Sequence, residues 1–389
     1  MKCIVQKFGG TSVATLERIK HVAEIIAKSR ANGENVVAVV SAMAGVTNRF
    51  VEYVRSLGAH EGEPEYDRVV SSGEMITAGL LAIALKNIGI NAKSYASWQV
   101  PIITNDNFGQ AMIKDVDPQR LLLDVKNGIV PVVCGFQGVT EAGDITTLGR
   151  GGSDFTAVGV SSAINADVCE IYSDVDGVYT IDPNLYSKAK RLSEINYDEM
   201  LEMAALGAKV LQEQSVAYAK EKNVVVRVIS SFVDTPGTIV SSNVDPKKIC
   251  GIAVINKLAN LKIIYNDEKD CSQEFVNFLD GRFIRSDVLR SKIGAAVLAI
   301  DSKKLQSAKT ALKADKRISS LKQEIVKQVV SKISIIGNEI DEENIVNLLN
   351  ENKIQINNYH KYNNRLDLIV LSGQLLKTVS FLHSICGLD

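Results

Sequence analysis

The sequence predicts an α/β protein with an open, mostly parallel sheet sandwiched by helices, followed by two smaller α+β modules. Strand-like apolar runs alternate with helical patterns through the first part of the 389 residues, which indicates a parallel sheet covered by helices. Nearer the end, one short helical motif occurs twice, which indicates an internal repeat. A chain of this length has room for two or three domains.

The predicted strands are short apolar runs. The first is residues 3–7, and further runs suited to strands buried on both faces are residues 36–40, 129–133 and 168–172. The helix after the first strand is predicted from apolar residues that recur at helical spacing: Ile19, Val22, Ala23 and Ile26. Because ligands of open parallel sheets bind at the carboxyl ends of the strands, we expect the site at that edge.

Composition and charge exclude several classes of protein. The chain has 44 Lys and Arg against 45 Asp and Glu, so it lacks the positive excess that nucleic-acid binding requires. Residues 1–7 carry charge too early for a signal peptide, and no later apolar run approaches the length of a membrane span. We therefore predict a cytoplasmic protein with no nucleic-acid or membrane partner.

The cysteines and histidines indicate neither a disulfide framework nor a metal centre. Six cysteines are scattered without paired spacing, which predicts buried, reduced thiols. Four histidines lie far apart in sequence, with no cysteine or second histidine at ligand spacing. No metal site formed by protein side chains is therefore predicted.

The functional signal lies in four short segments at predicted strand and helix ends: residues 7–12, 71–74, 146–154 and 172–179. In the first, Lys7 supplies a fixed positive charge, and Gly9 and Gly10 let backbone amides approach a ligand without a Cβ. This arrangement suits the phosphate oxygens of phosphoryl transfer. P-loop and Rossmann chemistry are excluded, because the lysine precedes the glycines and no Gly-x-Gly-x-x-Gly follows a strand.

The segment 146–154 predicts a Gly-rich loop that opens a helix, with Ser153 or Asp154 as the helix cap. Arg150 in this loop can hold a carboxylate through paired hydrogen bonds. Glu74 heads another predicted helix, where it either complements the helix dipole or binds a substrate ammonium.

In this order and spacing, the four segments resemble the aspartokinase branch of the amino-acid kinase family, over roughly the first three fifths of the chain. The resemblance implies an amino-acid kinase fold, with ATP and Mg²⁺ as cofactors and Lys7 and Asp154 as the catalytic pair. The reaction implied is phosphorylation of L-aspartate to 4-phospho-L-aspartate, the entry to lysine, threonine, methionine and diaminopimelate synthesis. The β-carboxylate of aspartate, with a solution pKa of about 3.9, is already ionised, so no general base is needed and Asp154 would orient Lys7 or the metal.

The resemblance also assigns the two sides of the site. The substrate side would comprise Thr47, Glu74, Phe136, Arg150, Gly151, Gly152 and Ser153. The ATP side would comprise Lys7, Phe8, Gly9, Gly10, Ser41, Ser173, Asp174, Tyr179, Asp182, Asn184, Lys209 and Val210. Two departures concern the ATP side: Asn184 stands where the family has Arg after Asp-Pro, and residues 212–214 read Gln-Glu-Gln where the family has His-Pro-Arg. We therefore keep the activity and expect lower nucleotide affinity.

We predict a catalytic domain at residues 1–242, a linker at 243–250 and a paired regulatory or dimerisation region at 251–389. The repeat in that region is Phe-Val-Asn-Phe-Leu at 275–279 against Ile-Val-Asn-Leu-Leu at 345–349. It implies two strand-helix-strand-strand-helix units and resembles the paired, ferredoxin-like ACT domains of regulated aspartokinases. Pairing of such modules predicts a homodimer or larger assembly through this region.

The strand-to-helix turns of these modules, residues 266–271 and 338–342, carry acids where ACT domains have a Gly-containing turn. Acids there would repel an effector carboxylate, so we predict at most weak inhibition by lysine or threonine. Two other functions stay open, namely another carboxylate or carbamate kinase of the superfamily and a non-catalytic amino-acid sensor. Four retained residues argue against the sensor, namely Lys7, Glu74, Arg150 and Asp154.

Overall fold

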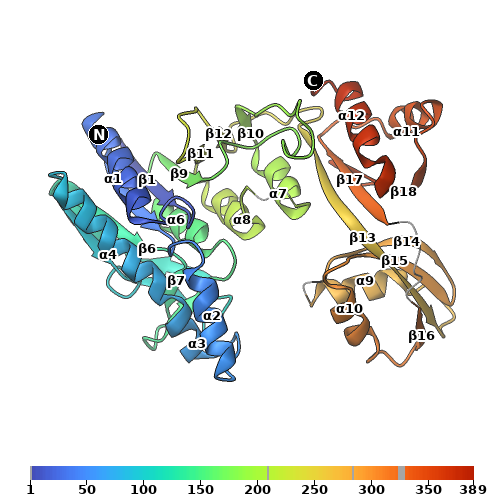
Figure 1. The fold of residues 1–389 in the computed structure, drawn as a ribbon, viewed down its shortest axis with the longest axis horizontal. Helices are drawn as coiled ribbons and strands as arrows, with labels where there is room; N and C mark the ends of the chain where they lie inside the picture. Colours follow the sequence, from blue (N-terminus) through green and yellow to red (C-terminus); the bar gives the residue numbers. More distant parts are fainter. Residues whose placement is uncertain (1, 208–209, 283, 323–328) are drawn as a thin grey trace. The chain divides into compact units, whose positions relative to one another are not determined.

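The computed structural model describes residues 2–207, 210–282, 284–322 and 329–389 (Figure 1). These residues form two compact units. The first comprises residues 2–178, 191–205 and 210–245. The second comprises residues 179–190, 206–207 and 246–389.

The first unit contains an eight-stranded, mostly parallel sheet, which confirms the predicted fold class. In spatial order its strands are β10 (Glu194–Ile195), β12 (Thr238–Val240), β11 (Val226–Ser230), β9 (Val168–Ser173), β1 (Cys3–Phe8), β2 (Asn35–Val40), β6 (Val130–Cys134) and β3 (Ala92–Tyr95). Neighbouring strands run parallel except β11 and β12. The four runs predicted as strands coincide with β1, β2, β6 and β9 to within one residue at each end.

Helices cover both faces of this sheet. On one face, α1 (Leu16–Ala31) and α4 (Ser72–Asn87) share a core with the strands, and the four predicted inward residues of α1 are buried there. On the other face lies α6 (Gly152–Ala163), which packs against β1, β2 and β9. Lys7 and Phe8 of β1 point to opposite faces, because successive side chains alternate along a strand. Phe8 therefore joins the α1 and α4 core, whereas Lys7 reaches Asp154 of α6.

A smaller sheet and further helices complete the first unit. The sheet has the order β5 (Ile113–Val116), β4 (Ile102–Thr104), β7 (Gln137–Val139) and β8 (Ile145–Thr147). The helices are α2 (Val46–Ser56), α3 (Pro64–Val70), α5 (Gln119–Lys126), α7 (Tyr197–Ala205) and α8 (Glu213–Lys222). Since β8 leads directly into the loop before α6, the small sheet positions that loop.

The second unit consists of two α+β modules in one sheet, as the repeat predicted. The first module contains β13 (Gly251–Tyr265), α9 (Ser272–Asp280), β14 (Ser286–Lys292), β15 (Ala295–Asp301), α10 (Leu305–Leu312) and β16 (Ile318–Lys322). The second contains β17 (Val330–Ile336), α11 (Glu342–Glu351), β18 (Ile356–Lys361), β19 (Arg365–Leu371), the 3₁₀ turn η1 (Ser372–Gln374) and α12 (Leu375–Ile385). The two copies of the repeated motif lie on the corresponding helices α9 and α11.

The long strand β13 belongs to both modules. Its first part pairs with β17, and its last part, from Leu258 onward, pairs with β15 and β16. The register shifts between Ile255 and Leu258, and Lys257 there has a positive φ of 58°. The order β14-β15-β13-β17-β19-β18 is therefore one continuous sheet with a hydrophobic core for each module.

The compact units follow the predicted boundaries only in part. The change of unit at residues 245–246 lies inside the predicted linker. Residues 179–190, however, which we assigned to the catalytic domain, pack with the second unit, because Ile181 is buried in that unit's core. The roles of the two parts in catalysis and regulation stay predictions.

One helical stretch is more apolar than the sequence analysis expected. Residues Pro64–Asn87, which include α3 and α4, contain an 18-residue window with a mean hydropathy of 1.4 and could cross a membrane by length and composition alone. Half of that window is buried inside the protein, and α4 packs Ala78, Leu81 and Leu85 against the sheet. We therefore interpret it as a core helix.

The cysteines are free thiols, as predicted. Four of the six are buried and the other two are half-buried. Burial raises the pKa of the Cys134 and Cys169 thiols to about 12. Because the thiolate is the reactive form, these two cysteines are inert near neutral pH.

Candidate active site

A cavity of about 300 Å³ in the first unit lies where β1, β2 and β6 end. It is lined by residues that follow these strands directly, among them Gly10, Ser41 and Phe136. This is the sheet edge at which we expected a ligand. The predicted site residues that line it are Lys7, Gly10, Ser41, Thr47, Glu74, Phe136, Gly151, Gly152, Ser153 and Asp154.

Lys7 and Asp154, which both line the cavity, form a close ion pair with 2.5 Å between Nζ and Oδ1. The two side chains are only 10% and 11% exposed. Asp154 lies in the first turn of α6, where the helix dipole stabilises a negative charge. The pair therefore holds the Lys7 ammonium in place beside the turn that contains Gly9 and Gly10. The catalytic role of the pair stays a prediction.

The helix α6 begins earlier than we predicted. Its N-cap is Gly151, with a φ of 72° that favours glycine, and not Ser153 or Asp154. A Cβ at Gly151 would also lie 2.3 Å from the Gln212 side chain. The earlier start moves Ser153 and Asp154 into the first turn, where their side chains line the cavity instead of capping the helix.

Glu74 is a buried carboxylate with an unused acceptor. Its side chain is 3% exposed, Oε1 accepts a hydrogen bond from the Ala42 amide at 2.9 Å, and Oε2 has no partner among the described residues. Burial raises its pKa to about 8, against the lowering effect of backbone N–H donors. A buried acid that lacks one partner is suited to receive a cationic group from a ligand.

Phe136 adopts an unusual backbone conformation beside the cavity, with a φ of 68°. Two hydrogen bonds hold it: its amide donates to the Thr156 hydroxyl at 3.1 Å, and its carbonyl accepts from the Leu148 amide at 3.0 Å. A Cβ added to Gly152 would lie 2.8 Å from the Phe136 ring. Strained residues held in this way are frequent at ligand sites.

Arg150 does not line the cavity. It is exposed to solvent, although Gly149 and Gly151 on either side of it do line the cavity. Both glycines have a positive φ of 72°, so the loop turns sharply on each side of the arginine. The predicted role of Arg150 in holding a carboxylate stays a prediction.

Asp67 of α3, which sequence reasoning missed, anchors the loop that carries Arg150. The carboxylate is fully buried and accepts hydrogen bonds from the Gly109 amide at 2.9 Å and from the Thr147 amide and hydroxyl at 2.7 and 2.8 Å. Burial raises its pKa, and the three hydrogen bonds oppose that rise. Gly109 and Thr147 lie 42 and 80 residues away in sequence, so no local pattern predicts this contact.

The loop after β2 and the start of α2 supply most of the other residues that we missed. From this region we selected only Ser41 and Thr47. The additional lining residues there are Ala42, Met43, Ala44, Gly45 and Asn48, and Gly149 in the loop before α6 also lines the cavity. A Cβ at Gly10 would lie 3.0 Å from the Ala42 carbonyl, so the glycine turn and the loop after β2 approach closely. Most of these missed residues could have been found in the sequence from their position after a buried strand, because their residue types do not indicate a function.

The predicted ATP residues near β1 and β9 are arranged at the same edge. The Gly9 amide donates to the Tyr172 carbonyl at 3.1 Å, and the Ser231 amide donates to the Ser173 carbonyl at 3.1 Å. Ser173 Oγ accepts from the Val175 amide, which stabilises the turn that carries Asp174. The Phe8 ring instead lies in the core, stacked on Tyr172 with 4.8 Å between the ring centroids, and the Phe8 carbonyl accepts from the Ser41 amide, so the Phe8 side chain is not available to a ligand.

The other predicted ATP residues are distributed between the two units. Tyr179, Asp182 and Asn184 belong to the second unit, and Val210 to the first. The Asn184 side chain is turned back onto Asp182, to which it donates a hydrogen bond at 3.1 Å. Lys209 lies outside the described residues.

Comparison with known proteins identifies the family. Residues 2–230 match the model of the amino acid kinase family, so the chain belongs to that family. An aspartokinase of Bacillus sp. (strain MGA3) is 34% identical over 98% of this chain and 97% of its own length. An aspartokinase of Mycolicibacterium smegmatis is 36% identical over 100% of this chain and 97% of its own length. Within the family, the chain belongs with the aspartokinases.

A higher identity holds over a shorter region. An aspartate kinase of Stutzerimonas stutzeri (strain A1501) is 49% identical over 267 residues, which are 68% of this chain and 65% of that relative. The chain matches about 65% of the length of such relatives.

Solved aspartokinase structures are similar over almost the whole chain. E. coli aspartokinase III in complex with lysine and aspartate, described as the T-state, has a TM-score of 0.79 and 26% identity over 99% of both chains. The same enzyme with aspartate and ADP, described as the R-state, has a TM-score of 0.76 and 25% identity over 98% of this chain and 99% of that chain. The arrangement of a parallel sheet followed by two α+β modules is therefore that of an aspartokinase.

Proposed function

We propose that the chain transfers the γ-phosphoryl group of ATP to the β-carboxylate of L-aspartate, which gives 4-phospho-L-aspartate for the synthesis of lysine, threonine, methionine and diaminopimelate. The observation that carries this proposal is the cavity that contains both the Lys7–Asp154 pair and the unpartnered oxygen of Glu74. The first feature suits a phosphate group and the second an ammonium group. Aspartate and ADP are ligands of a similar enzyme, E. coli aspartokinase III.

On the substrate side, Glu74 binds the α-ammonium of aspartate through Oε2. An ammonium at this oxygen stabilises the ionised carboxylate, so binding lowers the pKa of Glu74 from its ligand-free value of about 8. Arg150 binds the α-carboxylate after the loop between Gly149 and Gly151 turns it toward the cavity. Thr47 and Ser153 line the same cavity, where their hydroxyl groups hydrogen-bond the substrate.

In the phosphoryl transfer, Lys7 neutralises charge on the phosphate oxygens, and Asp154 holds the lysine in position. The Gly10 amide approaches the phosphate group without a Cβ in the way, whereas the Gly9 amide already donates to the Tyr172 carbonyl. No residue acts as a general base, because the β-carboxylate is already ionised near neutral pH. The nucleotide side of the first unit is completed by the predicted residues after β2 and β9, and the ATP roles of Tyr179, Asp182 and Asn184 stay predictions.

Mg²⁺ enters with the nucleotide. Among the described residues no group of three His, Cys, Asp or Glu side chains could hold a metal ion. This is compatible with Mg²⁺, which at kinase sites is held largely by phosphate oxygens and water. The ion neutralises charge on the phosphates, and the residues named above position the substrate.

The second unit regulates and assembles the enzyme in this proposal. Lysine is a ligand of E. coli aspartokinase III, whereas the acid-rich turns of this chain favour at most weak binding of lysine or threonine. The end strands β14 and β18 of the described sheet approach each other, because the Asn358 side chain donates to the Val288 and Leu289 carbonyls at 3.2 and 3.1 Å. A homodimer or larger assembly in the cytoplasm is therefore proposed from the pairing of such modules and not from open sheet edges, and sedimentation of the purified chain tests it.

A hydroxamate assay of the purified chain with ATP tests the proposed activity. Aspartate should give hydroxamate, whereas glutamate, succinate and carbamate should give little, because the cavity pairs Glu74 with an ammonium at a fixed distance from Lys7. Product from a carboxylate without an ammonium group would indicate another carboxylate kinase. A chain that binds aspartate without turnover would be the amino-acid sensor.

A further inference from the structure

The turn that follows β1 is tied to the end of β11 by a buried hydrogen bond between two serines. This turn, residues 9–12, is called the glycine turn here because it contains Gly9 and Gly10. Ser12 and Ser231 are 0% and 2% exposed, and the Ser231 hydroxyl donates to the Ser12 hydroxyl oxygen at 2.7 Å. Both residues lie in the first unit, 219 positions apart in sequence. The contact therefore fixes the glycine turn against a distant part of the chain.

Backbone hydrogen bonds attach both partners to the last residues of β9. The Gly9 amide donates to the Tyr172 carbonyl, and the Ser231 amide donates to the Ser173 carbonyl, each at 3.1 Å. In the sheet, β9 lies between β11 and β1. The serine pair thus links the ends of β1 and β11 across the end of β9, beside the turn that carries Asp174.

Arg18 of α1 orients the Ser231 hydroxyl. Its Nη2 donates to the Ser231 carbonyl at 2.7 Å and to Ser231 Oγ at 3.0 Å, and its guanidinium carbon lies 3.9 Å from the centroid of the Phe232 ring. Because Oγ accepts from Arg18, its single hydrogen is left for another acceptor. Ser12 at 2.7 Å is a better acceptor than the Ser173 carbonyl, which lies 3.5 Å away.

The glycine turn and the catalytic lysine are held by different partners. Lys7 is held by its ion pair with Asp154, which does not involve the serine pair. The glycine turn is held by Ser12 and by the Gly9 amide. A variant can therefore loosen the turn while the Lys7 ammonium stays in place.

We propose that Ser12, Arg18 and Ser231 are positioning residues for the triphosphate, because they fix the glycine turn that meets the phosphate oxygens. The inference rests on the proposed function. Since Ser12 and Ser231 are buried, they contact neither substrate and act through the turn. The aspartate side, with Glu74 on α4, shares none of these hydrogen bonds. Loss of the network therefore weakens nucleotide binding selectively.

The test compares Ser231→Ala, Ser12→Ala and the double variant. We expect Ser231→Ala to raise the KM for ATP and the calorimetric Kd for ADP about tenfold, the size of one lost buried hydrogen bond. The KM for aspartate should stay within about twofold and kcat within about threefold, because Asp154 still holds Lys7. In the double variant the ADP Kd should equal that of Ser231→Ala, because the two side chains share one hydrogen bond.

Arg18→Lys separates geometry from charge, because it keeps the positive charge but loses the planar guanidinium; it should raise the ADP Kd about threefold. Ser29→Ala is the matched control. Ser29 lies in the last turn of the same helix, where its hydroxyl accepts from the Gln6 side chain at 2.9 Å. Gln6 keeps Glu170 as an acceptor, so this variant should leave all constants unchanged.

An unchanged ADP Kd in Ser231→Ala or Arg18→Lys would overturn the positioning role, and a lower free energy of unfolding in the same variant would show that the network only stabilises the fold. Equal increases in the KM for ATP and aspartate, or multiplied effects in the double variant, would overturn it as well. Each of these results would leave the proposed function intact if the parent chain phosphorylates aspartate. A parent chain that neither binds ADP nor forms aspartyl phosphate would overturn the proposed function, and the inference with it.

Discussion

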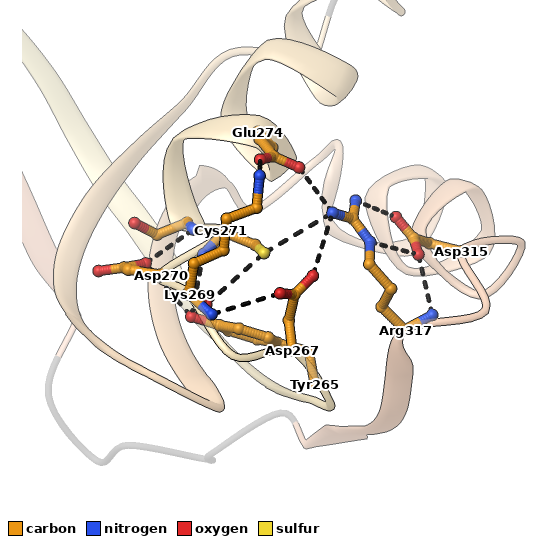
Figure 2. Close-up of polar contacts among 9 residues, drawn as sticks. Tyr265, Asp267, Lys269, Asp270, Cys271, Glu274, Asp315 and Arg317 are labelled. Carbon is orange, nitrogen blue, oxygen red and sulfur yellow. Dashed lines mark hydrogen bonds and ion pairs between the residues drawn. The ribbon is translucent and has the colours of Figure 1, made fainter.

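Two clusters of acidic side chains, one in each unit, differ in whether their charges already have partners. In the cavity of the first unit, one oxygen of Glu74 has no partner among the described residues. At the turn between β13 and α9, Arg317 pairs with Asp315 at 2.7 Å and Glu274 at 2.6 Å and lies 3.8 Å from Asp267 (Figure 2). The first cluster can still bind a cationic ligand group, whereas the second is largely neutralised within the chain.

The backbone of the same turn is also occupied. Asp267 Oδ1 accepts from the Lys269 amide at 3.3 Å, and Asp270 Oδ1 accepts from the Ser272 amide at 2.9 Å. The Cys271 amide donates to the Tyr265 hydroxyl at 3.2 Å (Figure 2). The sequence argument for weak effector binding was repulsion by free acids. The structure adds a different reason, because the amides that would meet an effector carboxylate already have acceptors.

The largest effect is expected for Lys7→Ala. Loss of the fixed charge at the phosphate should lower kcat at least on the order of a hundredfold, the scale of one lost preorganised partner. Lys20→Ala on the exposed side of α1 is the control and should retain parental activity. The hydroxamate assay measures both, and a Lys7→Ala enzyme within a few-fold of the parent would remove Lys7 from the catalytic role.

Glu74→Gln should have the next largest effect. The amide keeps an oxygen to accept from the Ala42 amide but cannot pair with an ammonium, so the KM for aspartate should rise about tenfold or more. The KM for ATP should change little. Glu65→Gln on α3, at an exposed position, is the matched control. Steady-state kinetics with each substrate varied would contradict the assignment if both KM values rose together.

The sequence predicted the parts of this site that are encoded locally. Lys7, Gly10 and Ser41 were found because each follows or ends a short buried strand, and parallel strands bring such ends together. The burial of Asp67 and the packing of Ile181 with the second unit could not be predicted, since their partners are distant in sequence. The helix start at Gly151 was missed because glycine caps through its backbone conformation, which leaves no side-chain signature.

Arg150→Ala should raise the KM for aspartate about tenfold or less, with a smaller change for ATP. We expect the KM for aspartate to rise less in Arg150→Ala than in Glu74→Gln, because Arg150 is exposed and must be ordered when substrate binds. Arg68→Ala, another exposed arginine, serves as the control. Equal weakening of both substrates would place Arg150 on the nucleotide side.

Glu74 should also make the ligand-free protein less stable as the pH rises. Its pKa is about 8 in the folded state and near 4.5 when unfolded, so the folded state binds the additional proton between these values. The free energy of unfolding should therefore fall from about pH 4.5 to about pH 8 and level off above that, as far as this group contributes. Glu74→Gln should reduce this fall, which urea unfolding at several pH values without ligand can measure. An identical pH dependence in parent and variant would contradict the raised pKa.

The smallest effect is expected for lysine or threonine added to the parent enzyme. Arg317 and Lys269 already neutralise part of the acidic charge at the turn after β13, and the amides of Lys269, Cys271 and Ser272 already have acceptors. At the corresponding turn before α11, the Asp341 side chain accepts from the Asn344 amide in the same way. An effector would have to displace these internal bonds, so calorimetry should detect weak binding or none, and the hydroxamate assay little inhibition.

The decisive variant for this last prediction is Arg317→Ala in the full-length chain. Deletion of residues 251–389 would be ambiguous, because it would also expose Ile181 and the segment 179–190 around it. If the internal ion pairs exclude the effector, removing Arg317 should strengthen lysine binding relative to the parent, since free carboxylates would then face the lysine ammonium groups. Tight lysine binding by the parent, weakened in Arg317→Ala, would instead mean that Arg317 forms part of an effector site.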